Sequence, residues 1–187
     1  MIIVIDGIDG SGKDTQIELL RKKVKFEYFK YPTPTNQMIN DYLNRKIEIS
    51  GSELVDLFLD DIYDEQEKIV NASKKDLVIL DRYVFSTIAY EAHLIQFEDI
   101  QKRIERMGFV SPDKVILFDI PAKVSYERKK KQKKLDRYEE NSRYLEQVRQ
   151  NFLRLFEEMY LARKWVKIDA TKSIEEVHKE LEKEIKS

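Results

Sequence analysis

The sequence has no cysteine, little glycine and proline, and almost no net charge. Its 187 residues include 5 Gly and 4 Pro, and 34 Lys plus Arg against 35 Asp plus Glu give a formal net charge of −1. The absence of cysteine excludes disulfides, thiolate metal sites and cysteine nucleophiles. The balanced charge argues against a general nucleic-acid binder, which would carry a basic excess.

Long apolar runs are also missing. No run approaches the roughly 18 residues that a membrane span requires. The first apolar run, residues 1–5, ends at Asp6 and is too short for a signal peptide. We therefore expect a soluble, cytoplasmic protein with neither a nucleic-acid nor a membrane partner.

Apolar residues still make up 42% of the chain, which is enough for one packed domain over residues 1–187. Short apolar blocks rich in β-branched residues alternate with longer segments of helical spacing. The blocks are Ile2 to Ile5, Phe26 to Tyr31, Leu77 to Leu80, Val115 to Phe118 and Trp165 to Ile168. Their continuous apolar character predicts an α/β fold with a mainly parallel sheet covered by helices on both faces.

Four of these blocks end at or next to an aspartate: Asp6, Asp81, Asp119 and Asp169. In open parallel sheets, ligands bind beyond the carboxyl ends of the strands. We therefore expect the four strand-end aspartates to line the functional site.

The first block runs directly into a glycine-rich phosphate loop. Residues 7–13 match G-x-x-x-x-G-K between a predicted strand and a predicted helix. Glycines let successive backbone N–H groups face an anion, and the helix N-terminus adds its positive dipole. The alternative interpretation is a glycine-rich turn that binds nothing. The predicted nucleotide-binding residues are Gly7, Ile8, Asp9, Gly10, Ser11, Gly12, Lys13, Asp14 and Thr15.

The motif fails at its last letter, because Asp14 stands where a hydroxyl normally ligates Mg²⁺. Asp14 could be a first-turn carboxylate favoured by the helix dipole. The sharper hypothesis is that Asp14 ligates Mg²⁺ directly or through water, since hard cations accept carboxylates.

A second acidic signal, Asp81-Arg82-Tyr83, follows the third block. A carboxylate at this strand end suits a contact to a metal-bound water, and Arg82 supplies a planar fork for phosphate oxygens. The alternative is a structural Asp–Arg pair. No glycine stands three residues after Asp81, and no [NT]-K-x-D motif follows the last block. GTPases are therefore excluded, which leaves a kinase of small metabolites.

At this point the sequence resembles the thymidylate kinase family of P-loop nucleoside monophosphate kinases. The resemblance spans nearly the whole chain, and its most specific part is D-R-Y-x-x-S-x-x-A-Y at residues 81–90. The other matching segments are residues 7–16, Tyr31-Pro32, Phe58 in its helix, Asp136 to Glu139 and Asp169 to Ser173.

The resemblance implies a P-loop NTPase fold with a five-stranded parallel sheet and a short basic lid. It implies transfer of the γ-phosphoryl group of ATP to the 5′-phosphate of dTMP, giving dTDP, with Mg²⁺ as cofactor. It also implies a homodimer.

The family roles carry over residue by residue. Lys13 and its loop would hold the ATP phosphates, Asp9 would position the acceptor, and Arg82 would bridge donor and acceptor phosphates. Asp81 would organise Mg²⁺ or its waters, and the loop from Asp169 to Ser173, with Lys172, would border adenine. Phe58 would stack on thymine, although its apolar helical stripe also fits core packing. Tyr90 would crowd the sugar 2′ position. The predicted substrate-binding set is completed by Tyr31, Pro32, Ser86 and Tyr138.

A basic run with six cations in residues 128–134 follows the fourth block. Charge runs are usually solvated faces. The position of this run matches the family lid, so we predict a mobile lid over residues 128–142. Arg128 and Arg137 would support the transferring group there, because arginine offers a bidentate fork that lysine lacks.

Three positions depart from the family pattern. Pro34 and Ile62 replace arginines expected near the acceptor, and Glu91 stands where many relatives have Gln. Acidic residues also crowd positions 56–65. Two alternatives therefore stay open: a kinase for another deoxynucleoside monophosphate such as dUMP, and a nucleotide-binding module without catalysis.

Overall fold

The computed structural model describes residues 1–130 and 142–187 of the chain. Within these ranges, five parallel strands form one sheet in the order β2-β3-β1-β4-β5. The strands are β1 (Ile2–Asp6), β2 (Glu27–Lys30), β3 (Val78–Asp81), β4 (Lys114–Asp119) and β5 (Trp165–Asp169). Each strand falls on one of the five apolar blocks, so the predicted parallel sheet is confirmed.

The central strand β1 is buried along its whole length and pairs with β3 on one side and β4 on the other. β-Branched residues dominate β1, and they suit a pleated surface that is packed on both faces. The chain leaves β1 at Asp6 and enters the glycine-rich loop. That loop therefore lies at the carboxyl edge of the sheet, in the middle of the strand order.

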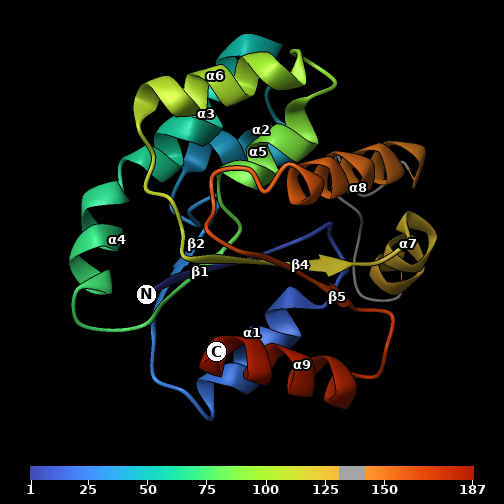
Figure 1. Cartoon of the computed structure of the whole chain (residues 1–187). Coiled ribbons are helices and arrows are strands. Elements are labelled where there is room, and N and C mark those ends of the chain that lie inside the picture. The colour runs from blue at the N-terminus through green and yellow to red at the C-terminus, as the bar shows by residue number, and fades with distance from the viewer. Residues whose placement is uncertain (131–141) are drawn as a thin grey trace.

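Helices cover both faces of the sheet (Figure 1). On one side α1 packs against α9, and on the other α5 packs against α3, α6 and α8. The helices described are α1 (Lys13–Arg21), α2 (Gln37–Leu43), α3 (Gly51–Tyr63), α4 (Gln66–Ser73), α5 (Val84–Glu91), α6 (Phe97–Met107), α7 (Ala122–Lys130), α8 (Ser142–Glu157) and α9 (Ile174–Lys186).

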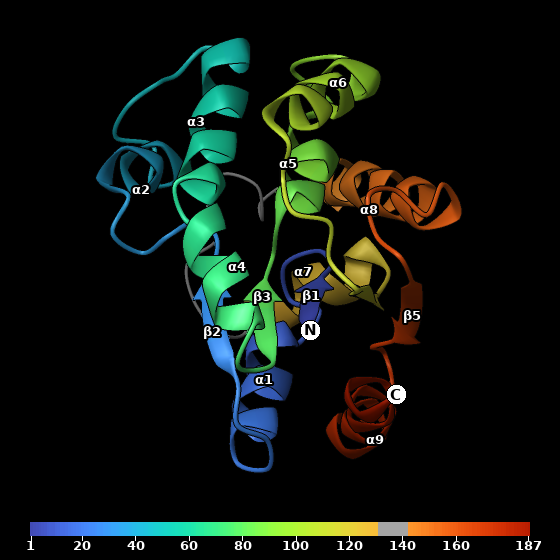
Figure 2. The same cartoon turned by 60° about the vertical axis from the view of Figure 1, so that its left-hand side comes forward.

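In the turned view of Figure 2, α3 lies above the strands, on the side of the sheet where β2 forms the edge, and α2 lies beside α3. At the carboxyl edge of the sheet α7 lies near the end of β4 (Figure 1). None of the helices in residues 1–130 or 142–187 combines the length and apolar character that crossing a membrane demands.

Candidate active site

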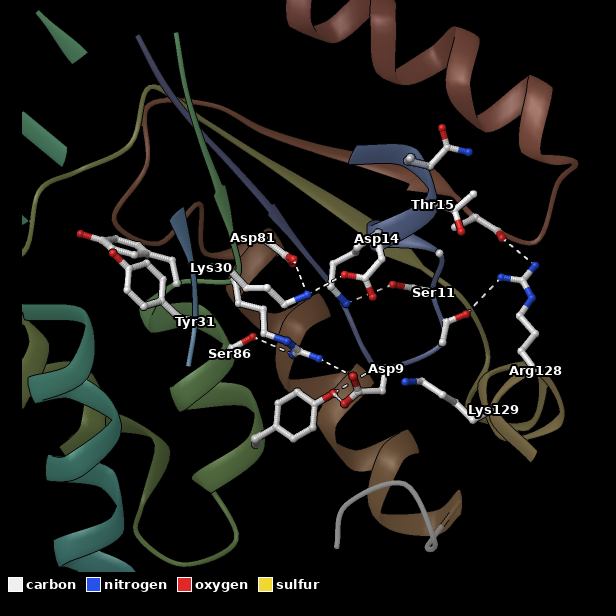
Figure 3. A pocket seen from close by; sticks show the side chains of 18 of the residues that line it. Asp9, Ser11, Asp14, Thr15, Lys30, Tyr31, Asp81, Ser86, Arg128 and Lys129 are labelled. Carbon is white, nitrogen blue, oxygen red and sulfur yellow. Dashed lines mark hydrogen bonds and ion pairs between the residues drawn. The ribbon is translucent and has the colours of Figure 1, made fainter. Parts of the chain in front are cut away.

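A cavity of about 710 Å³ opens at the carboxyl edge of the sheet, between the glycine-rich loop and helices α3, α5 and α7 (Figure 3). Its size and its mixture of apolar walls with a few polar groups are typical of a small-molecule site. The predicted residues that line it are Asp9, Gly10, Ser11, Gly12, Lys13, Asp14, Thr15, Tyr31, Pro32, Phe58, Asp81, Arg82, Ser86, Tyr90, Arg128 and Lys172.

The loop conformation depends on glycines with positive φ. Gly7, Gly10 and Gly12 have φ values of 141°, 74° and 93°. A Cβ atom on Gly7 would collide with the backbone oxygen of Phe118 in β4. The loop can therefore pass this close to the sheet only because residue 7 has no side chain.

Lys13 is buried and its ammonium group lies against the inside of the loop. The Nζ atom donates to the carbonyl oxygens of Gly7 and Ile8, at 2.8 and 3.2 Å, and to Ser11 Oγ at 3.4 Å. Burial, together with the nearby charge of Arg82, lowers the pKa of Lys13 to about 8. The ammonium is thus held by neutral carbonyl and hydroxyl oxygens, which balance its charge only partly. A phosphate that binds in the loop would offer it negatively charged oxygens instead.

Asp9, Arg82 and Tyr90 form a hydrogen-bonded cluster next to the loop. Arg82 Nη2 lies 2.6 Å from Asp9 Oδ1, and the Tyr90 hydroxyl donates to Asp9 Oδ2 at 2.8 Å. Burial opposes ionisation of Asp9, but the adjacent charge of Arg82 holds the pKa of Asp9 below its ordinary value. Arg82 also donates to Ser86 Oγ at 3.1 Å, so both ends of its guanidinium are fixed.

A third cluster joins the first turn of α1 to the end of β3. Lys30 Nζ lies 2.6 Å from Asp14 Oδ1 and 3.0 Å from Asp81 Oδ2 (Figure 3). The Tyr28 hydroxyl also donates to Asp81 Oδ2, at 2.8 Å. The two carboxylates predicted to serve a metal are therefore close enough to share one cation.

The acceptor side of the cavity is walled by apolar and aromatic residues. Phe58 and Ile62 of α3 line it together with Leu43. Tyr31 and Pro32, which follow β2 and are joined by a cis peptide bond, also line it. Phe58 is only partly buried, as a ring that offers one face to a ligand would be.

Two of the acidic residues crowded on α3, Asp61 and Asp56, have structural partners. Buried Asp61 accepts hydrogen bonds from the backbone N–H and hydroxyl of Thr33, at 2.7 and 2.6 Å, and from Asn36 Nδ2 at 2.9 Å. It therefore holds the loop after Pro32. Asp56 pairs with Arg103 at 2.5 Å on the exposed side of the helix.

The opposite end of the cavity joins the glycine-rich loop to the segment between β5 and α9. Arg128 donates to the carbonyl oxygens of Gly10 and Ala170, at 3.3 and 3.0 Å. Gln16 Nε2 donates to the carbonyl oxygen of Ile174 at 2.9 Å, and Gln16 Oε1 lies 2.9 Å from His178 Nδ1. Lys172 lies at this end too and pairs with Glu180 at 2.6 Å.

Not every predicted site residue lines the cavity. Gly7 and Ile8, at the start of the loop, do not line it, and their carbonyl oxygens accept from Lys13 Nζ. Arg137 and Tyr138, together with most of the predicted lid, lie outside the described residues.

The expectation for the strand-end aspartates was wrong for three of the four. Asp81 lines the cavity, whereas Asp6 is buried beneath the loop, where it accepts from Gly7 N and Ser86 Oγ, both at 2.8 Å. Asp119 is held by Arg149, with Nε 2.6 Å from Oδ1. Asp169 caps its own turn by accepting from Thr171. A strand-end position places a carboxylate at the correct edge but does not set its direction.

Four further residues that line the cavity fall where the sequence placed them: Ala170 and Ser173 in the segment expected at adenine, Lys129 in the predicted lid and Ile62 near the acceptor. The lining residues without a predicted role are Gln16, Lys30, Leu43, Tyr83, Thr87, Glu91, Ile174 and Val177. Thr87 and Glu91 lie one helical turn apart on α5, on the face that carries Tyr90 toward the cavity. That spacing was available in the sequence and could have identified them.

A phosphate loop at the end of the central strand, facing a pocket with an arginine and aromatic walls, defines a P-loop nucleotide kinase. The family model for thymidylate kinase matches residues 5–181. The chain belongs to the thymidylate kinase family.

The sequence is similar to those of archaeal and yeast relatives over most of their length. The chain is 35% identical to a protein of Methanocaldococcus jannaschii described as "Probable thymidylate kinase", covering 97% of this chain and 93% of the relative. It is 33% identical to the thymidylate kinase of Schizosaccharomyces pombe, covering 96% and 89%. Among solved structures, thymidylate kinase from Candida albicans matches with a TM-score of 0.81 and 26% identity, covering 99% of this chain and 90% of the other.

Proposed function

We propose that this protein transfers the γ-phosphoryl group of ATP to the 5′-phosphate of dTMP, producing dTDP and ADP. The observation that carries the proposal is a cavity in which the Lys13 loop faces the cluster of Asp9, Arg82 and Tyr90. A donor phosphate on the loop and an acceptor phosphate near Arg82 would lie in the same cavity.

The reaction requires no nucleophile from the protein. A phosphate oxygen of dTMP attacks the γ-phosphorus in line, a new P–O bond forms, and the bond to the β,γ-bridging oxygen breaks. The protein contributes alignment and neutralisation of charge. Lys13 and the loop N–H groups would hold the ATP phosphates, and Arg82 would span the transferring group and the acceptor phosphate.

The residues present fit a Mg²⁺ ion. Asp14 and Asp81 already share the Lys30 ammonium, which stands in for a cation between them. Within the described residues, no group of three or more His, Cys, Asp or Glu side chains could hold a metal ion. This agrees with the habit of Mg²⁺ of binding one or two carboxylates together with substrate phosphates. When bound, Mg²⁺ would neutralise charge that develops on the phosphate oxygens.

The acceptor side supplies the basis for base and sugar recognition. Phe58 would stack on thymine. Tyr90, fixed by its bond to Asp9, would crowd the sugar 2′ position. Tyr31, Pro32 and Ser86 would complete this wall, and Lys172 would border adenine at the other end.

The lid stays a prediction. Arg128 would contribute to it from the end of α7, and Lys129, which lowers the pKa of Asp9 electrostatically, lies beside it. Arg137 and Tyr138 would supply its remaining contacts. We also propose that residues 1–187 act as one kinase domain, in the cytoplasm, as a homodimer. Sedimentation equilibrium would measure the oligomeric state.

A panel of monophosphates tests the proposed function. ADP production from ATP and Mg²⁺ is measured with dTMP, dUMP, dCMP and AMP, for the native protein and for Lys13→Ala. We expect dTMP to give the highest kcat/KM and Lys13→Ala to abolish turnover. A preference for dCMP or AMP would contradict the thymidylate assignment. Tight ATP binding without turnover on any acceptor would instead favour a module without catalysis.

A further inference from the structure

The ammonium of Lys30 occupies the position between the two carboxylates proposed to serve the metal. It contacts Asp14 at 2.6 Å and Asp81 at 3.0 Å, and all three side chains line the cavity (Figure 3). The other basic residues that line the described part of the cavity are Lys13, Arg82, Arg128, Lys129 and Lys172.

Sheet pairing places Lys30 at this point. Lys30 is the last residue of β2 and stands directly opposite Asp81, the last residue of β3. The Asp14 side chain projects from the first turn of α1 and is 78% exposed, whereas Asp81 is 1% exposed. Lys30 therefore joins a buried carboxylate to one at the mouth of the cavity.

The charge at position 14 explains why such a cation is needed. A serine or threonine hydroxyl there would be neutral, but Asp14 adds a negative charge beside Asp81 and near the phosphates of a bound nucleotide. Two carboxylates close enough to contact the same ammonium repel each other when that ammonium is removed. The Lys30 ammonium offsets that repulsion because it contacts both carboxylates.

We propose that Lys30 is a positioning residue: a tethered counter-ion that holds Asp14 and Asp81 in the absence of nucleotide and competes with free divalent metal for them. The inference rests on the proposed Mg²⁺-dependent reaction. A divalent ion that arrives alone must displace the ammonium. A metal that arrives on a triphosphate brings negative charge, to which the displaced ammonium can turn. Lys30 thus makes metal binding depend on nucleotide.

Metal binding to the nucleotide-free protein tests this directly. Free Mn²⁺ is titrated and followed by its electron paramagnetic resonance signal, in the native protein, Lys30→Met, Lys30→Arg, Asp14→Thr and the double variant Asp14→Thr/Lys30→Met. Lys46→Met is the matched control, because Lys46 also pairs with a carboxylate, that of Asp41 at 2.8 Å, and neither residue lines the cavity.

We expect Lys30→Met to bind Mn²⁺ about tenfold or more tightly than the native protein, because removing a nearby positive charge removes its repulsion. Lys30→Arg and Lys46→Met should match the native protein. The double variant should lose the gain, since one of the two carboxylates is gone. Circular dichroism establishes that each variant is folded, and Lys30→Gln replaces Lys30→Met if the latter is not.

Equal Mn²⁺ affinity in Lys30→Met and the native protein overturns the proposal. A gain that persists in the double variant overturns the role given to Asp14. The Mn²⁺ affinities of Lys30→Met and of the double variant are both measured without nucleotide and without turnover. A failure of the kinase assignment, which would appear as no ADP production by the native protein, is therefore distinguishable from a failure of this inference.

Discussion

The guanidinium of Arg82 is hydrogen-bonded to the carboxylate of Asp9 across 2.6 Å, from the end of β3 to the loop that follows β1. Arg82 adopts a positive φ of 69°, and its backbone N–H donates to the carbonyl oxygen of Ile5 at 3.1 Å. A non-glycine residue in this conformation carries strain that the surrounding bonds must offset. The pair thus fixes the direction of the arginine before any ligand arrives.

Asp9→Asn should therefore lower kcat with dTMP by on the order of 10²-fold, because the neutral amide no longer orients and balances the guanidinium. Steady-state ADP production measures the effect. Asp41→Asn is the control, since Asp41 is likewise paired with a cation, Lys46, and neither residue lines the cavity. Unchanged kcat in Asp9→Asn would contradict the role given to the pair.

Asp61→Ala should raise the KM for dTMP by about tenfold while kcat changes less, because the loop after Pro32 loses the acceptor of three hydrogen bonds. The matched control is Asp60→Ala, which removes an exposed carboxylate from the same helix. Initial rates at varied dTMP separate the two parameters. Equal KM values in the two variants would show that Asp61 does not support the acceptor wall.

Asp6 should make the stability of the protein fall as the pH rises. Burial raises the pKa of Asp6 to about 6, although the charges of Arg82 and Lys13 oppose this. Between its ordinary pKa near 4 and this value the folded state binds more protons than the unfolded state, so the free energy of unfolding decreases with pH. The contribution of this group amounts to about 3 kcal/mol.

Asp6→Asn removes that titration, and an amide oxygen can still accept from Gly7 N and Ser86 Oγ. Urea denaturation of both proteins at pH 4 and pH 7.5 gives the difference in unfolding free energy. This difference should shift in favour of Asp6→Asn as the pH rises. A difference that stays constant with pH would place the pKa of Asp6 near its ordinary value.

Gly7→Ala should lower the free energy of unfolding by more than about 2 kcal/mol, because positive φ strain adds to a collision with the backbone oxygen of Phe118. Gly108→Ala is the matched control. Gly108 has a φ of 73°, but a Cβ atom there would meet nothing within 4 Å, so about 1 kcal/mol is expected. Thermal and urea denaturation compare the two. Equal losses would show that the contact with Phe118 is not limiting.

The strands and the phosphate loop could be predicted because local pattern decides them. A run such as Ile2 to Ile5 is apolar on both faces, and a parallel strand covered by helices has this requirement. The glycine spacing before Lys13 is likewise a local signal, because each glycine stands where the loop backbone has a positive φ.

The ionic contacts of the site could not be predicted in this way. Lys30 meets Asp81 through the register of β2 against β3, and it meets Asp14 through the angle at which α1 leaves the loop. Neither relation is encoded in the spacing of the three residues. The same holds for Asp61, whose role depends on the loop that lies over α3.

The hydrogen bond from the side-chain amide of Gln16 bears on how contacts to the nucleotide base contribute to the rate. This bond joins α1 to the first residue of α9, and Arg128 joins Gly10 of the loop proposed to receive phosphates to Ala170 of the segment proposed to receive adenine. The parts of the site proposed for the two ends of a nucleotide are therefore hydrogen-bonded to each other. Contacts made to the base could thus fix the phosphorus atom in line with its acceptor, which is how remote parts of a substrate contribute to rate.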